Sequence, residues 1–426
     1  MNLAPRLAHR TPFFYGWVVL GSASSTQIVR NAAASLTIAV FMFPLAEDLG
    51  WSRTLIAGAA SFGGLAASGA SPVVGWLIDR YGARLVLAVS VFILGLSTIS
   101  LAWATVPIAF YLAYGVGRVI FSSPVQIGAS VVASRWFIRM RGRASGILFL
   151  SHSVGMIVFP LVASIVIDMS GWRDAWIVLG VIVWAVALLP ATLLIAQSPE
   201  DVGLRPDGDD ATDADEDSNG AADDEPGWTL KSAMKTPALW ILATATGALF
   251  LMQAGINTHL AAFLRDEGLS PVFAGVGVGL NAAFLGLGSI AWGWIVERLP
   301  ARHVMTGVAA TMALGAVLFM TTNSTSQALL YSAVFGFGLG GMLSVPPVAY
   351  ADYYGRRSLG TIRGVTEPFT SLGQAIGAVA AGAVFDMTGS YEYAFIAFAA
   401  LGALTMLMVQ LARPPRYVPE ATTEGS

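Results

Sequence analysis

The feature that most constrains this chain is a series of long apolar runs separated by short polar segments. An apolar run of roughly 18 or more residues can cross a lipid bilayer as an α-helix. Only 12% of the 426 residues are charged, against about 25% in soluble domains. The runs are continuous and rich in Ala, Leu, Gly and Val instead of alternating, which favours helices over a membrane β-barrel. We therefore predict an all-α membrane protein.

These runs predict twelve membrane-spanning helices. The first six cover 16–44, 55–78, 85–103, 108–134, 144–167 and 175–196. The second six cover 237–264, 272–296, 303–321, 327–350, 362–385 and 393–411. The spans divide the chain into an N-terminal six-helix half (1–196), a linker (197–236), a C-terminal six-helix half (237–412) and a tail (413–426). Prolines at 72, 124, 160, 346 and 347 mark places where spans are expected to kink.

The two halves repeat one sequence pattern at a constant offset. The stretch GWLIDRYGAR at 75–84 returns 218 residues later as GWIVERLPAR at 293–302, and DMSG at 168–171 returns as DMTG at 386–389. One offset that holds across six spans indicates two related halves of the same orientation. Parallel repeats of this kind form a pseudo-two-fold pair about the membrane normal, with a solute site between them near the midplane.

The linker contains ten acidic residues between Asp207 and Glu225 and no basic one. Such a run cannot bury enough apolar surface to fold, so we expect a disordered segment. Lys and Arg gather in the loops on the side of the linker and both termini, which the positive-inside rule assigns to the cytoplasm. We expect a multi-pass plasma-membrane protein with cytoplasmic termini.

The composition also excludes several classes of function. The chain has no Cys, and its four His residues show no metal-ligand spacing, so we expect no metal site. It lacks the glycine-lysine pattern of an ATP-binding P-loop. We expect no enzymatic activity, no cofactor and no nucleic-acid partner, and we expect a monomer in the lipid bilayer that binds a small organic solute.

The turn between the second and third spans carries the pattern Gly-x-x-x-Asp-Arg-x-Gly-x-Arg. Its five fixed positions are filled by Gly75, Asp79, Arg80, Gly82 and Arg84. This pattern resembles the signature loop of the major facilitator superfamily. The resemblance implies a twelve-helix fold, transport by alternating access, and a conformational latch formed by the charges of this loop. The degenerate second copy adds to the predicted latch Glu297, Arg298 and Arg302.

Three further segments, YGWVVL, FPLAEDLGWSR and SRWFIRMRGRASGI, resemble the monocarboxylate and oxalate/formate transporter branch of that superfamily. This resemblance implies a small carboxylate as substrate, moved with a proton or by exchange. Members of that branch place a basic residue on the eighth span. Here 272–296 contains no Lys or Arg, and Asn281 is among its few polar side chains.

Arg30 lies in the middle of the first predicted span. A charged side chain at the bilayer centre costs about 3 kcal/mol or more unless it faces a wet cavity or a partner. Gln27 shares its helical stripe, so this stripe is expected to face the central cavity. We interpret Arg30 as the anchor for an anionic substrate. The alternative is an arginine that binds helix carbonyls and serves packing.

Arg118 lies in the fourth predicted span and shares a stripe with Tyr111 and Gln126. It loosely resembles the arginine that proton-coupled members of the superfamily carry on their fourth helix. A cavity site and a structural bridge between helices are equal alternatives for it.

Glu367, in the eleventh predicted span, is a candidate for proton coupling, because a buried carboxylate can exchange a proton near neutral pH. It could instead cap its helix or pair with Arg363. His152 is a second candidate proton carrier, and its alternative is a packing role.

Three amides of the C-terminal half complete the predicted substrate site: Gln253, Asn257 and Asn281. The leading hypothesis is a secondary transporter of a small organic anion that works by proton coupling or anion exchange. The alternatives are a proton-coupled multidrug efflux pump and a membrane sensor that binds a solute without transporting it.

Overall fold

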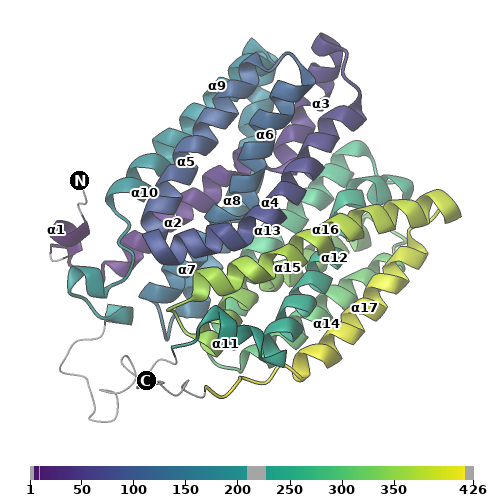
Figure 1. Cartoon of the computed structure of the whole chain (residues 1–426). Helices are drawn as coiled ribbons and strands as arrows, with labels where there is room; N and C mark the ends of the chain where they lie inside the picture. Colours follow the sequence, from purple (N-terminus) through teal and green to yellow (C-terminus); the bar gives the residue numbers. More distant parts are fainter. Residues whose placement is uncertain (1–3, 9, 209–226, 418–426) are drawn as a thin grey trace.

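The computed structural model describes residues 4–8, 10–208 and 227–417 (Figure 1). Within these ranges the regular structure is helical and contains no strand. Twelve helical spans in this part of the chain are long and apolar enough to cross a membrane. The prediction of an all-α membrane protein with twelve spans is therefore confirmed.

The helices of residues 4–208, here called the N-half, begin with a short terminal helix and continue through six spans. Their bounds are α1 (Ala4–Ala8), α2 (Gly16–Val29), η1 (Arg30–Ala33), α3 (Ser35–Leu49), α4 (Arg53–Tyr81), α5 (Ala83–Ser100), η2 (Leu101–Trp103), α6 (Pro107–Ser122), α7 (Pro124–Trp136), α8 (Arg141–Ser170), α9 (Trp172–Val183), η3 (Trp184–Leu188) and α10 (Leu189–Leu193).

The helices of residues 227–417, here called the C-half, are fewer and longer. Their bounds are α11 (Leu230–Met234), α12 (Pro237–Asp266), α13 (Pro271–Val296), α14 (Ala301–Phe319), α15 (Thr325–Tyr354), α16 (Leu359–Thr388) and α17 (Glu392–Gln410).

Helix bounds in the two halves repeat at the offset seen in the sequence. Helix α16 begins and ends 218 residues after α8, and α15 covers the same interval after α6 and α7 together. Helix-ending glycines match as well, since Gly171 and Gly389 both adopt positive φ, at 90° and 69°. The division into two related domains stays a prediction, and these bounds support it.

The halves differ where the N-half helices are interrupted. The first span turns into a 3-10 segment at Arg30, and Ala34 is extended with ψ 153°. The fourth span breaks at Ser123 (φ −124°, ψ −79°), because Pro124 has no N–H to donate and its ring crowds the preceding turn. Of the prolines expected to kink spans, only Pro124 starts a new helix. The others lie inside α4, α8 and α15.

Two helix pairs make the most extensive contacts between the halves: α4 packs on α16, and α8 packs on α13. We call these two contacts the seam. Glycine lets the backbones approach, since a Cβ on Gly75 would collide with Gly360, and a Cβ on Gly142 would collide with Gly293. All four glycines lie at the helix ends near α11, the side that we call the linker side (Figure 1). The seam is therefore closed on the linker side.

The ends of the predicted linker are ordered, in contrast to the expectation for the whole segment. Residues 197–208 form the turns Glu200–Val202 and Pro206–Gly208. The carboxylate of Asp207, the first residue of the acidic run, accepts hydrogen bonds from the backbone N–H groups of Ile138 (2.9 Å) and Arg139 (2.8 Å). The remainder of the acidic run, 209–225, lies outside the described residues.

Candidate functional site

Arg30 is buried at the point where α2 gives way to the 3-10 segment. Its Nη1 donates to the backbone carbonyl of Phe121 (3.1 Å) and to Oε1 of Gln126 (2.9 Å). The break between α6 and α7 leaves the Phe121 carbonyl open to this donor. Both interpretations of Arg30 thus find support, because one guanidinium binds a helix carbonyl and also a side chain of the central site.

Gln126 continues the contact across the seam. Its Nε2 donates to Oε1 of Glu367 on α16 (3.0 Å), which also accepts from the Thr370 hydroxyl (2.9 Å). Glu367 is 5% exposed and lies 4.0 Å from the guanidinium of Arg363. Arg363 in turn donates to the Ser130 hydroxyl on α7. Polar side chains of both halves therefore meet in one buried network.

The guanidinium of Arg118 differs from that of Arg30 in its hydrogen bonding. Its guanidinium carbon lies 4.5 Å from the centroid of the Phe121 ring, and that of Arg30 lies 4.6 Å from the same centroid. In the described part of the chain Arg118 has no hydrogen-bond or ion-pair partner, and its Nε is buried. A single aromatic ring thus holds two guanidiniums near each other. The N–H groups of one of them, Arg118, donate to no acceptor in the described part of the chain.

Three arginines and one carboxylate gather here: Arg30, Arg118, Arg363 and Glu367. Positive charge exceeds negative charge in a region that α-helices enclose. Buried charges in a membrane protein are costly unless they are paired or face a polar solute. The arrangement therefore favours an anion beside the unpaired guanidinium.

His152 faces the same group. Its Nδ1 lies 3.4 Å from Nε of Arg30 and 3.1 Å from Nδ2 of Asn31. A guanidinium can only donate, so Nδ1 must be the acceptor and the ring is neutral in this arrangement. His152 thus orients Arg30. Its role as a proton carrier stays a prediction.

The other predicted substrate residues are less closely connected. Gln27 donates to the Val125 carbonyl (3.4 Å), Tyr111 to that of Leu55 (2.8 Å) and Asn281 to that of Ser332 (3.2 Å). These bonds tie helices of the same half to each other. Gln253 and Asn257 each have a buried amide oxygen without a partner. Asn31, which contacts His152, donates to the backbone carbonyl of Gln27 (3.1 Å). Within the described ranges, the side chains of these five residues make no hydrogen bond to the Arg30 network.

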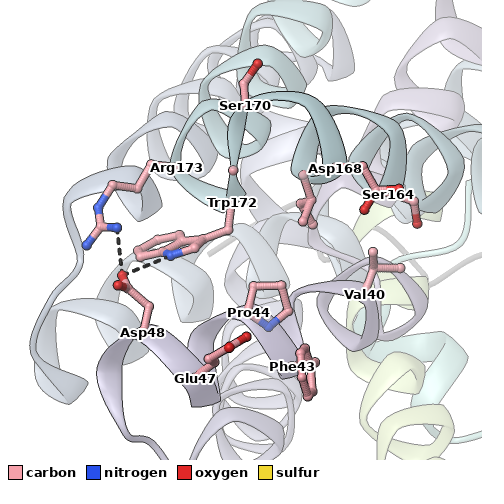
Figure 2. Close-up of a pocket in the computed structure, with 12 residues that line it drawn as sticks. Val40, Phe43, Pro44, Glu47, Asp48, Ser164, Asp168, Ser170, Trp172 and Arg173 are labelled. Atoms are coloured by element: carbon pink, nitrogen blue, oxygen red, sulfur yellow. Dashed lines mark hydrogen bonds and ion pairs between the residues drawn. The ribbon is translucent and has the colours of Figure 1, made fainter.

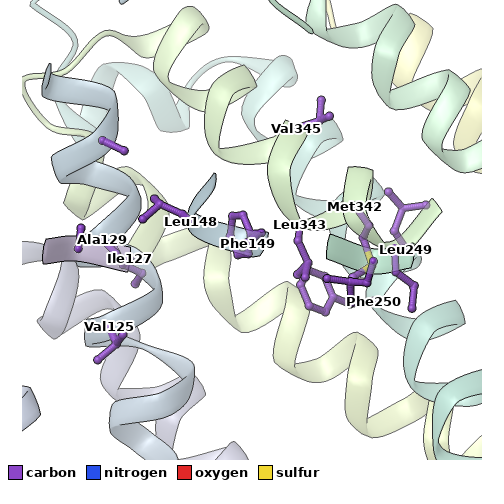
Figure 3. Close-up of a cluster of buried hydrophobic side chains, with 14 of the residues drawn as sticks. Val125, Ile127, Ala129, Leu148, Phe149, Leu249, Phe250, Met342, Leu343 and Val345 are labelled. Atoms are coloured by element: carbon purple, nitrogen blue, oxygen red, sulfur yellow. The ribbon is translucent and has the colours of Figure 1, made fainter. Parts of the chain in front are cut away.

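Apolar side chains of both halves gather in a buried cluster (Figure 3), and some of them line the same cavity as Gln126 and Glu367. Val125, Ile127, Leu148 and Phe149 come from the N-half, and Leu249, Phe250, Met342 and Leu343 come from the C-half. A cavity of about 20 Å³ remains beside Gln126 and Glu367, space for roughly one water. The low local polarity strengthens the hydrogen bonds that are present and raises the cost of losing one.

The predicted latch joins the halves at the linker side. The carboxylate of Asp79 accepts from the backbone N–H of Gly360 (3.1 Å) and Thr361 (2.6 Å), in the first turn of α16. It also accepts from the Thr361 hydroxyl (2.7 Å) and from Arg135 (3.2 Å). Asp79 therefore stabilises the N-terminus of a helix in the other half, where a negative charge is favourable.

Glu297, 218 residues after Asp79, makes the corresponding contact in the opposite direction. Its carboxylate accepts from the backbone N–H and from Nε of Arg143, both at 2.8 Å, in the first turn of α8. Two carboxylates thus cross the seam as a pair and meet the N-termini of α8 and α16.

Apart from Gly75, which packs on Gly360 across the seam, the remaining latch candidates stay within their own halves. Arg84 donates to the Thr192 carbonyl (2.7 Å), and Arg298 binds the Trp294 carbonyl (3.0 Å) of its own helix. Gly82 ends α4 with φ 89°, Arg80 is exposed, and Arg302 has a buried Nε without a partner. Within the described ranges, none of these five residues forms a hydrogen bond across the seam.

Phe121, Asn31, Arg135 and Thr361 are site residues that the sequence analysis missed. Phe121 follows Arg118 by three positions and so shares its helical face, a spacing that could have revealed it. Arg135 and Thr361 become visible only when the seam brings distant segments together.

A larger hollow, about 830 Å³, lies elsewhere (Figure 2). It is lined by α3 and by the junction of α8 and α9, at the helix ends away from the linker side. Asp48 there accepts from Arg173 (2.7 Å) and from Nε1 of Trp172 (3.1 Å). None of the predicted site residues lines this hollow, so its size does not make it the candidate site.

Twelve spans around a buried charged network, with carboxylates that cross a glycine-lined seam, define a multi-pass membrane transporter for a small solute. The chain belongs to the Major Facilitator Superfamily, whose family model matches residues 27–284 and 260–426.

Similar proteins agree with this assignment. The chain is 22% identical to an MFS-type transporter of Bacillus subtilis, YcxA, over 82% of this chain and 84% of that protein. It is 23% identical to the oxalate:formate antiporter of Oxalobacter formigenes over 89% of each chain. Among solved structures, the proton:xylose symporter XylE superposes with a TM-score of 0.75 at 14% identity and covers 93% of this chain and 95% of that one. The structural likeness concerns the fold alone.

Proposed function

We propose that this transporter carries a small carboxylate anion, which binds between Arg30 and Arg118. One observation carries the proposal: Arg118 has a guanidinium without a hydrogen-bond or ion-pair partner in the described ranges, and it shares the Phe121 ring with Arg30. A carboxylate can accept two parallel N–H bonds from such a group. The similarity to an oxalate:formate antiporter supports the same class of substrate.

Glu367 is the proposed site of proton coupling, with anion exchange as the alternative mode. It is a buried carboxylate that sits across the seam from Arg30, joined to it through Gln126. His152 is the secondary candidate. Gln253, Asn257 and Asn281 are proposed as neutral contacts that an anion meets when the halves rearrange.

The latch sets the direction of access. We propose that the linker side is cytoplasmic, that both termini lie there, and that the membrane is the plasma membrane, because most loop Lys and Arg gather on this side. With the seam closed at that end, the conformation described here is closed to the cytoplasm. Asp79 and Glu297 hold this state, and their release opens the site to the cytoplasm.

The test uses the purified chain and a panel of formate, oxalate and acetate with the neutral amides formamide and acetamide. Calorimetry on wild type, Arg30→Gln and Arg118→Gln should show a carboxylate affinity lower by about ten- to hundredfold in each variant, because one charge-assisted bond is worth about 1.5–3 kcal/mol. Binding of a neutral amide should change less. Equal weakening of both ligand classes would assign the arginines to helix packing.

Transport is tested separately in liposomes loaded with one carboxylate. Uptake of a labelled carboxylate that requires the internal carboxylate would indicate exchange. Uptake driven by a proton gradient imposed in a second arm would indicate proton coupling. Binding without any uptake in either arm would contradict transport and favour the sensor alternative.

A further inference from the structure

The side-chain amide of Gln126 is held at both ends by charged groups from opposite halves. Arg30 can only donate hydrogen bonds, so the atom that faces it at 2.9 Å must be the amide oxygen. The NH2 group then faces Glu367 at 3.0 Å, where an ionised carboxylate can only accept. The partners on both sides therefore fix the orientation of this amide.

The position of Gln126 in the fold makes it sensitive to changes on either side. It lies in the first turn of α7, three residues after the break at Ser123. It is 9% exposed, and the cavity beside it has room for roughly one water. Bulk water therefore cannot readily replace a partner that the amide loses.

We propose that Gln126 is the positioning residue that couples occupancy of the arginine pair to closure of the seam, an inference that rests on the function proposed above. An anion bound at Arg30 takes the Nη1 donor that otherwise holds the Gln126 oxygen. Gln126 then loses one of its two anchors, its bond to Glu367 weakens, and the linker side is released. Without an anion, Arg30 holds Gln126 in place and the seam stays closed.

The first test needs no ligand. The chain has no Cys, so Tyr81→Cys and Leu299→Cys place two spin labels at exposed positions on opposite halves at the linker side. Tyr81 ends α4, and Leu299 lies in the turn after α13. In this background, Gln126→Leu should raise the population with a long label distance, relative to the population with a short one, about tenfold. Gln126→Glu, which keeps an acceptor for Arg30 but sets a carboxylate against Glu367, should raise it as well.

The matched control is Gln410→Leu. It makes the same chemical change and removes a hydrogen bond of 2.7 Å to Thr306, but both residues belong to the C-half. The label distances should stay as in wild type. If Gln126→Leu does not fold, Gln126→Glu decides the matter. Label distances in a folded Gln126 variant that match wild type, while Asp79→Asn shifts them, would overturn the proposal.

The second test uses oxalate as the probe. In wild type, oxalate should shift the labels to longer distances. In Gln126→Leu, calorimetry should still show oxalate binding while the distances no longer respond. A response in Gln126→Leu as large as in wild type would overturn the coupling. If oxalate does not bind wild type, the carboxylate substrate is wrong, and the ligand-free comparison alone still decides the role of Gln126 in seam closure.

Discussion

Asp79 and Thr361 lie on opposite halves of the molecule, and one carboxylate oxygen of Asp79 accepts from both the backbone N–H (2.6 Å) and the hydroxyl (2.7 Å) of Thr361. The bond to the backbone does not depend on the side chain at position 361, whereas it does depend on the charge of Asp79. The seam is therefore more sensitive to a change at Asp79 than to one at Thr361.

Asp79→Asn should open the linker side and slow transport without abolishing substrate binding. The change weakens charge-assisted bonds to two backbone N–H groups and to Arg135, which are worth about 1.5–3 kcal/mol each. Label distances between positions 81 and 299 should lengthen, and carboxylate affinity by calorimetry should remain. Thr361→Val serves as the milder comparison. Loss of binding with unchanged distances would show that Asp79 acts on recognition.

Phe121→Leu should weaken carboxylate binding about fivefold. The ring holds two guanidiniums, each at the distance of a cation–π contact, and such contacts contribute about 0.5–2 kcal/mol. Without the ring, the like charges of Arg30 and Arg118 lose the group that positions them. Calorimetry measures the effect, and Phe92→Leu, which removes a ring stacked on Trp184 away from the arginines, is the control. An unchanged affinity in Phe121→Leu would disprove this role.

Gly142→Ala should destabilise the closed seam although alanine favours a helix. A Cβ at this position would collide with the carbonyl of Gly293 across the seam, so α8 and α13 must separate. Gly64→Ala in α4 is the matched control, because no atom lies within 4 Å of its added Cβ, and it should gain up to about 1 kcal/mol of helix stability. Spin-label distances report the seam. If both variants show the label distances of the closed state, the contact between α8 and α13 can adjust to the added Cβ, and the prediction is wrong.

A topology experiment tests the proposed orientation. Ser218→Cys in the linker should be protected from a membrane-impermeant thiol reagent in intact cells. Thr105→Cys, in the exposed loop between η2 and α6 on the opposite side, should react. The absence of native Cys removes background labelling. The opposite pattern of reactivity would place the termini outside and reverse the assigned direction of access.

The sequence predicts the spans well because the bilayer imposes a simple rule on composition and length. The predicted span 272–296 agrees with α13 (Pro271–Val296) to within one residue at its start. The offset of 218 appears in the helix bounds for the same reason, since equal apolar runs give equal helices. The interruption at Arg30 was not predicted, because apolarity continues through it. The break at Ser123 lies next to Pro124, one of the prolines at which a kink was expected.

The site is predicted less completely than the spans. Arg30, Gln126 and Glu367 are recognisable because charged or amide groups are rare in apolar runs, and the structure does bring them together. Tyr111 and Asn281 are also polar residues in apolar runs, but their side chains donate hydrogen bonds to neighbouring helices of their own half. Polarity alone cannot distinguish residues of the central network from residues that bond within one half. That distinction depends on which face of each helix meets the other half.

Only the N-half interrupts its helices at the depth of the arginines, whereas α12 and α15 continue through the corresponding positions. A helix that continues through these positions resists bending there, while a broken one can pivot about a few backbone torsions. The prolines of α15, Pro346 and Pro347, lie further along that helix. The two halves thus repeat the same six spans but differ in stiffness at this depth. If the C-half turns as a block, the N-half can also change its internal shape around Arg30 and Arg118. A solute held there would be released by local bending of two helices as well as by the rotation of one half against the other.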